Sequence, residues 1–339
     1  MSNQVDIADY RSWFNSTRYI VQDAIDRMVT DDPIFSIFGE VTDGGREDSI
    51  NVTGRSNDGF AEVKTPGQKA NKTAPVEADQ MNKNFFTVAE QQLVEWEAFL
   101  HDKYQLVEDT TTELVSKINA TIALALTHQL FNFADASTVT LPGGFSYDLT
   151  SPDSVPFVDD SHTVPGRPGE TFDNDVGNVA LSHDGLTTAI LQGQENEVSH
   201  KGTAQTFNPD MLFVGNVQPM IDKALQITKS EKVESTQNNA VNIYSGGWLK
   251  VAVLNFAPYL ATGNRDTTTK KYRWSIAQTD RLKGTLKHKW ASKPVAVGKF
   301  MDQENFDSSY SAAGRIGFGA CRWQGYYMAT STTAPTSSA

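Results

Sequence analysis

The residues best suited to chemistry are aspartates and histidines between positions 159 and 184. They are Asp159, Asp160, His162, Asp173, Asp175, His183 and Asp184. Clustered carboxylates and imidazoles can hold a divalent metal ion that activates water, so one hypothesis is a metal-dependent hydrolase. Metal ligands on helices or strands usually share one face, whereas this set is scattered through turns rich in proline and glycine. Aspartate favours turns because its carboxylate bonds nearby backbone, so turn formation explains the cluster more simply.

No other catalytic motif is present in the sequence. A serine hydrolase needs a G-x-S-x-G elbow, which is absent, and in an extended segment Ser161 and its neighbour His162 point apart. Gly317-Phe318-Gly319 lacks the later glycine and the following helix of a dinucleotide site, and no G-x-x-x-x-G-K phosphate loop occurs. We therefore predict that the protein is not an enzyme and has no cofactor, catalytic residue or metal site.

The remaining histidines and the tryptophans do not form a recognisable site. His101, His128 and His288 are isolated, and each is expected to be a packed or exposed side chain rather than a ligand. The tryptophans in the second half of the chain are Trp248, Trp274, Trp290 and Trp323. They could stack on nucleic-acid bases, but stacking platforms are usually combined with a basic groove. We expect packing in cores and interfaces, where tryptophan is enriched.

The charge of the chain is acidic overall and unevenly spread. The formal net charge of −12 argues against a whole-protein grip on nucleic-acid phosphates. Residues 250–299 nevertheless hold eleven Lys or Arg against Asp266 and Asp280, so this stretch carries +9 and the remainder carries −21. One interpretation is a solvated face. The other is a basic lobe that contacts the acidic body of another copy and fixes its orientation.

Length and composition predict a folded protein of about two compact units. The chain has 339 residues, of which 39% are hydrophobic and 21% charged. Its single cysteine, Cys321, cannot form an internal disulfide. We find neither an apolar run of the roughly 20 residues that a bilayer crossing needs nor a secretory pattern at the N-terminus. We therefore expect a soluble protein made in the cytoplasm.

The first part of the chain predicts two segments that reach away from a core. Residues 6–30 carry apolar side chains at helical spacing, including the adjacent Trp13 and Phe14, and Pro33 ends the pattern. Residues 39–83 are polar, with strand patterns at 49–54 and 59–64 around a turn. We interpret them as a β-hairpin that would be marginal alone and would rest on a neighbouring molecule. A disordered insertion is the alternative.

A long helix and an α/β segment follow. A strand pattern begins at residue 85, and apolar residues then recur at helical spacing from about Leu100 to Phe133, which would give a helix about 45 Å long. After turn-rich residues 135–178, Ser182 can cap a helix that ends near Gln194. The later predicted elements are a strand at 211–214, a helix from Pro219, strands at 248–256, 272–276, 294–300 and 315–330, and a frayed tail.

This order of elements resembles the major capsid protein family of tailed (Caudovirales-type) phages, which has the Hong Kong 97 fold. The similarity spans nearly the whole chain and rests on short phrases in a shared order. They are Asp159-Asp160-Ser161-His162, Asn178 to Ser182, Pro209 to Gly215 with the Ala- and Leu-rich helix after it, Asn305-Phe306-Asp307 through Tyr310, and Arg315 to Ala320.

The resemblance implies an α+β fold with the Hong Kong 97 arrangement of domains. Its expected parts are an N-terminal arm at 1–38, an extended β-hairpin loop at 39–84, a peripheral domain with a long spine helix at 85–150, an axial α/β domain at 151–292, return strands of the peripheral domain at 293–330 and a flexible tail at 331–339.

The resemblance also implies the function and the partners. A family member is a major capsid (head) protein that self-assembles as hexamers and pentamers into the icosahedral shell around packaged double-stranded DNA. It is a structural, non-catalytic virion protein, assembled in the host bacterial cytoplasm. The implied partners are a scaffolding protein, a portal and a decoration or cement protein, with no sequence-specific DNA binding and no membrane.

Basic and aromatic residues in the reaching segments and in the basic stretch are the expected contacts between subunits. They are Trp13, Phe14, Arg46, Arg55, Lys64, Lys69, Lys72, Arg265, Lys270, Lys271 and Arg273. Some relatives cross-link a loop lysine to an asparagine of the next subunit. No motif selects one of the lysines in or beside the loop here, so we do not transfer that chemistry.

Overall fold

The computed structural model describes most of the chain. The described residues are 33–42, 48–56, 76–94, 106–164, 167, 169–199, 202–231, 241–260, 262–265, 270–301 and 308–335. The helix predicted over residues 6–30 and the end of the tail lie outside them.

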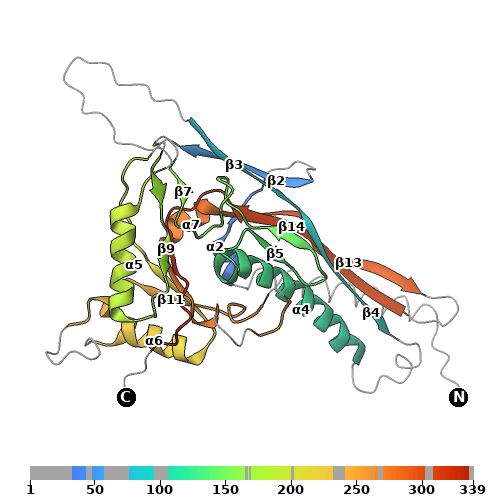
Figure 1. Cartoon of the computed structure of the whole chain (residues 1–339). Coiled ribbons are helices and arrows are strands. Elements are labelled where there is room, and N and C mark those ends of the chain that lie inside the picture. Colours follow the sequence, from blue (N-terminus) through green and yellow to red (C-terminus); the bar gives the residue numbers. More distant parts are fainter. Residues whose placement is uncertain are drawn as a thin grey trace, which may run out of the picture.

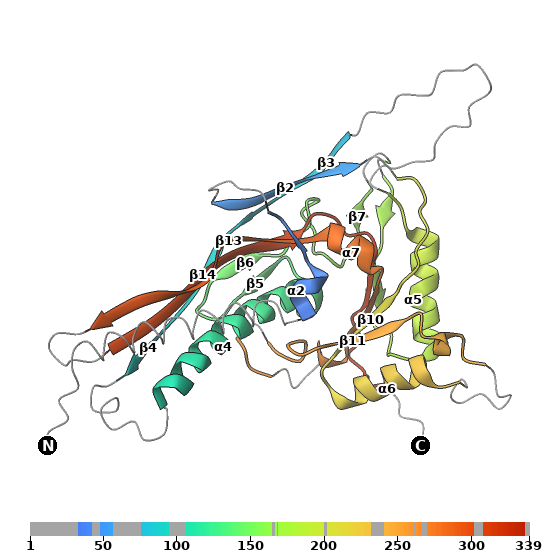
Figure 2. The ribbon, with the colours of Figure 1, turned by 180° about the vertical axis from the view of Figure 1, so that it is seen from behind.

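The first of two larger sheets has four strands in the order β1-β13-β14-β4 (Figure 1). They are β1 Gly39–Glu40, β13 Leu286–Met301, β14 Ser308–Ala320 and β4 Phe86–Val94. β14 lies in the middle and pairs antiparallel with β13 and with β4, whereas β1 pairs with β13 at only two positions. The long strands form a ribbon that extends away from the rest of the subunit (Figures 1 and 2).

The long helix predicted from the apolar spacing is present as α4 Leu106–Thr127, and it lies along the ribbon (Figure 2). Its buried side chains include Leu114, Ile118 and Ile122, which are four residues apart and so share one face. At its C-terminal end the helix widens into a π-helical turn, His128–Asn132. The short helix α2 Pro33–Ile37 also packs in this core.

A hairpin is present, but the predicted partner strand is wrong. β2 Ser49–Ser56 pairs antiparallel with β3 Val76–Asn84, from Ser49 opposite Asn84 to Ser56 opposite Val76. The strand predicted at 59–64 lies outside the described residues. The turn signal is a local feature of the sequence and cannot show which distant strand pairs with β2. The observed partner, β3, brings Met81 into a small core with Ile50.

The base of the hairpin packs on its own subunit, and its predicted contact with a neighbouring molecule stays a prediction. Ile50, Met81, Phe85 and Cys321 form a separate small core beside β14. Lys83 at the end of β3 bonds Asp148 at 2.7 Å. Asp148 ends a second hairpin, β5 Thr138–Thr140 and β6 Ser146–Asp148.

The second larger sheet has five strands in the order β11-β10-β12-β15-β9. They are β11 Lys250–Leu254, β10 Met211–Gly215, β12 Trp274–Ala277, β15 Tyr326–Ala329 and β9 Asp175–Gly177. Neighbouring residues enter different cores: Phe213 packs in the core that contains α4, whereas Leu212 and Val214 pack in a second core. Because both faces are buried at β10 and β15, these two strands are continuous apolar runs rather than alternating ones.

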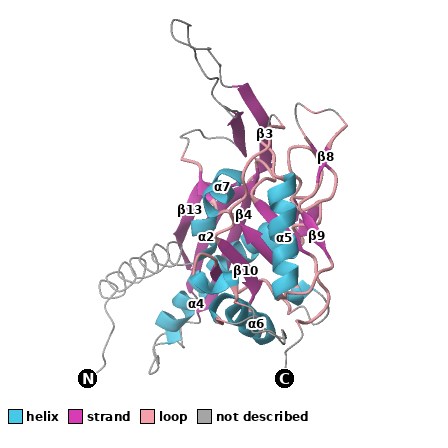
Figure 3. Cartoon of the chain, turned by 90° about the vertical axis from the view of Figure 1, so that its left-hand side faces the viewer, coloured by secondary structure: helices cyan, strands magenta, loops and turns pink. Residues whose placement is uncertain are grey.

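Two helices cover the second core (Figure 3). α5 His183–Asn196 begins where Ser182 accepts a hydrogen bond from the amide of Gly185, as predicted. α6 Gln218–Lys229 has Pro219 in its first turn. Both contribute buried side chains to the core that holds Leu212 and Val214. The helix α7 Thr279–Thr285, which leads into β13, was not predicted.

The remaining short elements connect these layers. They are β7 His162–Thr163, β8 Thr171–Phe172, η2 Ile243–Gly246 and η3 Lys270–Tyr272. No helix of the described part is long and apolar enough to span a bilayer.

The sheets do not follow the domain boundaries predicted at residues 292 and 330. β13 begins at Leu286 and belongs to the four-stranded sheet, whereas β15 lies in the five-stranded sheet. The chain therefore crosses between the two sheets once more than the prediction allowed, from β14 to β15. In β15, Tyr326 and Tyr327 bury their rings in different cores, on opposite faces of the second sheet.

Replacing Gly317 by alanine tests whether the base of the β2–β3 hairpin packs against β14. A Cβ at Gly317 would lie 2.8 Å from the Phe85 ring and 3.1 Å from Ile50, so Gly317→Ala should destabilise the protein by about 1–3 kcal/mol through overpacking. Gly284→Ala is the matched control because nothing lies within 4 Å of its Cβ position. Urea unfolding should show a lower midpoint for the first variant only. Equal midpoints would mean that the hairpin is not seated on β14.

Candidate assembly interface

The predicted contact residues fall into two groups. Trp13, Phe14, Arg46, Lys64, Lys69 and Lys72 lie outside the described residues. Among the others, Arg55 lies on β2 opposite Glu77, and Arg265 is exposed. Lys270 and Lys271 are half-buried, and Arg273 is buried.

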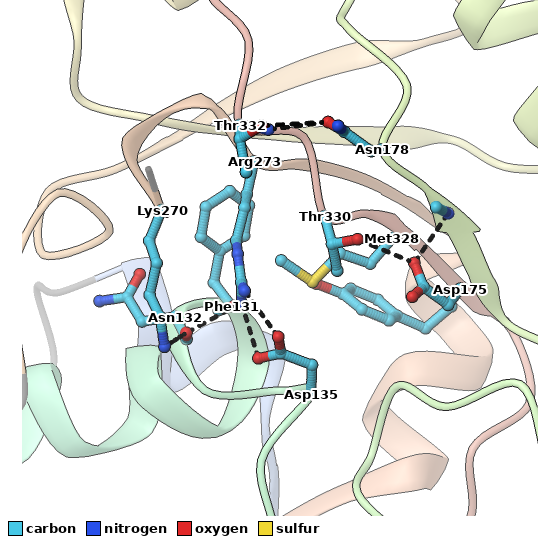
Figure 4. A network of polar contacts seen from close by, with 12 residues as sticks. Phe131, Asn132, Asp135, Asp175, Asn178, Lys270, Arg273, Met328, Thr330 and Thr332 are labelled. Carbon is cyan, nitrogen blue, oxygen red and sulfur yellow. Dashed lines mark hydrogen bonds and ion pairs between the residues drawn. The ribbon is translucent and has the colours of Figure 1, made fainter. Parts of the chain in front are cut away.

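Arg273 is held inside the subunit, where it joins the second sheet to the end of α4 (Figure 4). Its two terminal nitrogens donate to the two carboxylate oxygens of Asp135, at 2.8 and 2.6 Å. It also donates to the backbone carbonyl of Asn132 at 2.9 Å. A bidentate pair of this kind sets both distance and orientation between the groups it joins.

The π-helical turn supplies carbonyls that a regular helix end leaves unsatisfied. Lys270 donates to the carbonyl of Asn132 at 3.0 Å, and the Tyr326 hydroxyl donates to the carbonyl of Leu130 at 2.5 Å. Two cations thus lie at the negative end of the helix dipole, which is the favourable arrangement. The Lys270 ammonium also lies 3.6 Å from the centre of the Phe133 ring.

Asn132 also joins the segment after β11 to the π-helical turn through hydrogen bonds. Its side-chain amide donates to the carbonyls of Phe256 at 3.0 Å and Tyr259 at 2.7 Å, which follow β11. The amide also lies 3.1 Å from Nδ1 of His128. The end of α4, the η3 turn and the segment after β11 therefore form one polar junction between the two cores.

Burial changes the titration of the groups in this junction. Burial alone would raise the pKa of Asp135, but the hydrogen bonds and charge of Arg273, with the charge of Lys270, hold it below its usual value. Burial, with the charge of Lys270, lowers the pKa of His128 to about 3. Burial is also the main cause that lowers the pKa of His288 to about 4.

The structure corrects the prediction that the basic stretch forms one lobe. Residues 250–299 contribute strands to both larger sheets. Arg273 is paired with Asp135, and Arg281 is paired with Glu197 at 2.7 Å. In this conformation Arg273 is not an exposed contact for a neighbour, because the cost of leaving water requires an internal carboxylate partner.

Three of the five aspartates of the metal hypothesis act as turn caps. The carboxylates of Asp159, Asp173 and Asp175 each accept a hydrogen bond from the backbone amide two residues later, at 2.8–2.9 Å. His162 is fully buried, with Nδ1 2.7 Å from Asp153, and its ring stacks on Trp323. Within the described ranges, no group of three or more His, Cys, Asp or Glu side chains could hold a metal ion.

An exposed apolar surface near η2 was missed by the sequence analysis. Val241 is 77% exposed, Ile243 64% and Trp248 43%. We define these three residues as the η2 surface. Only Trp248 was singled out in advance, as the start of a strand and as one of the tryptophans expected to pack in cores and interfaces. One feature of the sequence could have predicted this exposure. Val241 and Ile243 lie among asparagines, where a core residue would not be expected.

The fold is similar to that of solved capsid proteins. A chain of the bacteriophage PhiM1 mature capsid matches with a TM-score of 0.53 at 11% identity, over 90% of this chain and 88% of that one. A capsid chain of the native GTA particle matches with a TM-score of 0.50 at 9% identity, over 88% and 90% of the two chains. This chain has the phage capsid fold.

The likeness is one of structure, since no protein-family model matches the chain and no curated protein sequence matches it. The predicted α+β fold of the Hong Kong 97 type is confirmed at the level of the whole chain. In this capsid-fold subunit, the polar junction is an internal feature that sets the angle between the ribbon and the second sheet.

Removing the guanidinium of Arg273 should destabilise the subunit strongly. Arg273→Ala leaves the Asp135 carboxylate and the end of α4 without their donor, and we expect a loss of about 2–4 kcal/mol in the free energy of unfolding, below the fully buried limit because Asp135 is partly exposed. Lys250→Ala, which removes an exposed cation from β11, should change it by less than about 0.5 kcal/mol. Urea unfolding followed by tryptophan fluorescence measures both, and similar losses would contradict the internal role of Arg273.

His128 and His288 should each contribute a loss of stability as the pH falls from about 6.5 to about 4. The unfolded chain binds protons at His128 and His288 with ordinary pKa values, whereas the folded chain resists them, so stability falls as the pH falls, by at most about 1.4 kcal/mol per histidine per pH unit. The lowered pKa of Asp135 acts below this window. His128→Gln should flatten the dependence of the urea midpoint between pH 7 and pH 4.5, and an unchanged slope would exclude His128 as a source.

Proposed function

We propose that this chain is the major capsid (head) protein of a tailed bacteriophage, which self-assembles into the icosahedral shell that encloses packaged double-stranded DNA. In this role the protein is structural and non-catalytic. The observation that carries the proposal is the structural likeness to capsid subunits over nearly the whole length of both chains.

The surface of the described subunit supports a role in repeated self-association. The η2 surface exposes three large apolar side chains on one short segment, and exposed apolar clusters mark sites of protein contact. Each copy in a closed shell meets several others through the same few surfaces. Apolar burial, at roughly 25 cal/mol per Å², would supply most of the adhesion, and charged groups would fix the orientation.

The proposed assembly consists of hexamers and pentamers in a virion that assembles in the host bacterial cytoplasm. A scaffolding protein, a portal and a decoration or cement protein are the partners we propose. The net charge of −12 suits a shell that encloses DNA without binding its sequence.

The proposed contacts between copies exclude the residues that the polar junction uses. We retain Arg55 on β2, the exposed Arg265 and Lys271. We also retain Trp13, Phe14, Arg46, Lys64, Lys69 and Lys72, which lie outside the described residues. Arg273 and Lys270 are assigned to the junction instead, because both bond the carbonyl of Asn132.

Electron microscopy of the purified chain, alone or with a scaffolding protein, tests the proposal together with a loop replacement. Ser56 lies opposite Val76, so an Asn-Gly pair in place of residues 57–75 would close the hairpin with a two-residue turn. The wild-type chain should form rings, tubes or shells. The replacement should keep the unfolding midpoint of the subunit and lose assembly.

The loop replacement preserves Ile50 and Met81, so it does not remove the small core under the hairpin. Loss of folding in this variant would contradict the role of the segment in contacts between copies. A wild-type chain that remains monomeric under all these conditions would contradict the capsid function itself.

A further inference from the structure

A small cavity lies where the chain crosses between the two larger sheets. It has a volume of about 290 Å³ and is bounded by α7, by the segment after α5 and by the segment that joins β14 to β15. α7 leads from the second sheet into β13, and the β14–β15 segment crosses back. Figures 1 and 2 show α7 between the ribbon and α5. Ligand sites span roughly 300–1,000 Å³, so this cavity suits a small ligand.

The walls of the cavity are mostly polar and are fixed by their own hydrogen bonds. Its polar lining side chains are Ser199, Gln205, Arg281, Thr285, Arg322 and Gln324. The Ser199 hydroxyl accepts a hydrogen bond from the backbone amide of Thr203 at 3.1 Å, and the Thr285 hydroxyl donates to the carbonyl of Gln324 at 3.2 Å. Walls that are ordered in advance reduce the entropy that a ligand loses on binding.

Arg281 has more hydrogen-bond donors than its partner uses. One terminal nitrogen donates to Glu197 at 2.7 Å, and the other oxygen of this buried carboxylate accepts from the Tyr327 hydroxyl at 2.9 Å. A guanidinium carries five N–H donors, and this side chain makes no second hydrogen bond with the described residues. Arg281 lines the cavity and is 25% exposed, so its remaining donors can meet a ligand there.

A second guanidinium gives the cavity a surplus of positive charge. Arg322 belongs to the β14–β15 segment, is half-buried and lines the same cavity. None of the described residues that line the cavity is acidic, and Glu197 beside Arg281 supplies one negative charge against two positive ones. Like charges in a partly buried site repel each other, and a bound anion offsets this repulsion.

Gln324 is the second feature that points to a ligand. Its residue is only 7% exposed, and its side-chain oxygen has no hydrogen-bond partner in the described part of the chain. Buried polar atoms without a partner are uncommon in folded proteins. Hydrogen phosphate carries acceptor oxygens, which suit arginine, and an O–H group, which can donate to an amide oxygen of this kind.

We propose that this cavity binds a free oxyanion of the phosphate class through Arg281 and Arg322. The planar fork of a guanidinium matches two oxygens of such an ion. Arg281 lies on α7, whereas Arg322 lies between β14 and β15. One ion bonded to both would therefore join the two crossings and stabilise the position of one sheet against the other. The site lies within one subunit and does not depend on the proposed shell.

Titration calorimetry of the purified chain with inorganic phosphate at pH 7 tests this inference, with chloride at equal ionic strength as the reference. The wild-type chain should bind phosphate, and phosphate should raise its urea midpoint. Arg322→Gln should weaken binding about ten-fold or more, because it removes charged donors. Lys283→Gln, which removes an exposed cation from α7, is the matched control and should bind as wild type does. No binding by the wild type, or equal weakening in both variants, would overturn the inference.

A carboxylate on the cavity wall gives a second arm that keeps both arginines. Gly284 lines the cavity, and nothing lies within 4 Å of a Cβ built there, so Gly284→Glu should fold and bring its carboxylate to the guanidinium groups. This variant should bind phosphate about ten-fold or more weakly, whereas Gly284→Ala should bind it as wild type does. Unchanged binding by the glutamate variant would sink the oxyanion site. The capsid function would still stand, because particle formation tests it separately.

Discussion

Both cores of this subunit depend on the five-stranded sheet, because the two faces of its central strands are buried in different cores. Tyr326 and Met328 of β15 pack in the core that contains α4, whereas Tyr327 and Ala329 pack in the core under α5 and α6. A one-residue slip of this strand would exchange all four side chains between the cores. Register in this sheet therefore determines how the ribbon and the helical layer are joined.

The polar junction stabilises that join where apolar packing ends. The π-helical turn presents successive carbonyls, and Arg273, Lys270 and Tyr326 supply the donors from the other side. Such groups are costly to bury unless they are paired, so the junction permits few relative positions of α4 and the second sheet. One defined shape would suit the repeated contacts of the shell that we propose.

The reaching elements follow a different principle. The β2–β3 hairpin has its base in a small core of its own subunit. The η2 surface leaves apolar side chains uncovered within the described part of the chain. Completion of this surface by identical copies would connect the stability of each subunit to the assembly that we propose.

The sequence by itself determined the elements whose signals are local. Apolar spacing predicted α4, and Ser182 predicted the start of α5. Turn formation was correctly predicted for Asp159, Asp173 and Asp175, whose carboxylates each bond the backbone amide two residues on. Pairing partners were decided only by tertiary structure, because a turn signal at 56–59 carries no information about Val76–Asn84 and a charge count cannot show that Arg273 has Asp135 beside it. The sequence also could not predict that Lys270 bonds the end of α4 or that β15 belongs to the second sheet. Both depend on contacts between residues more than 100 positions apart, and no local pattern records such distances.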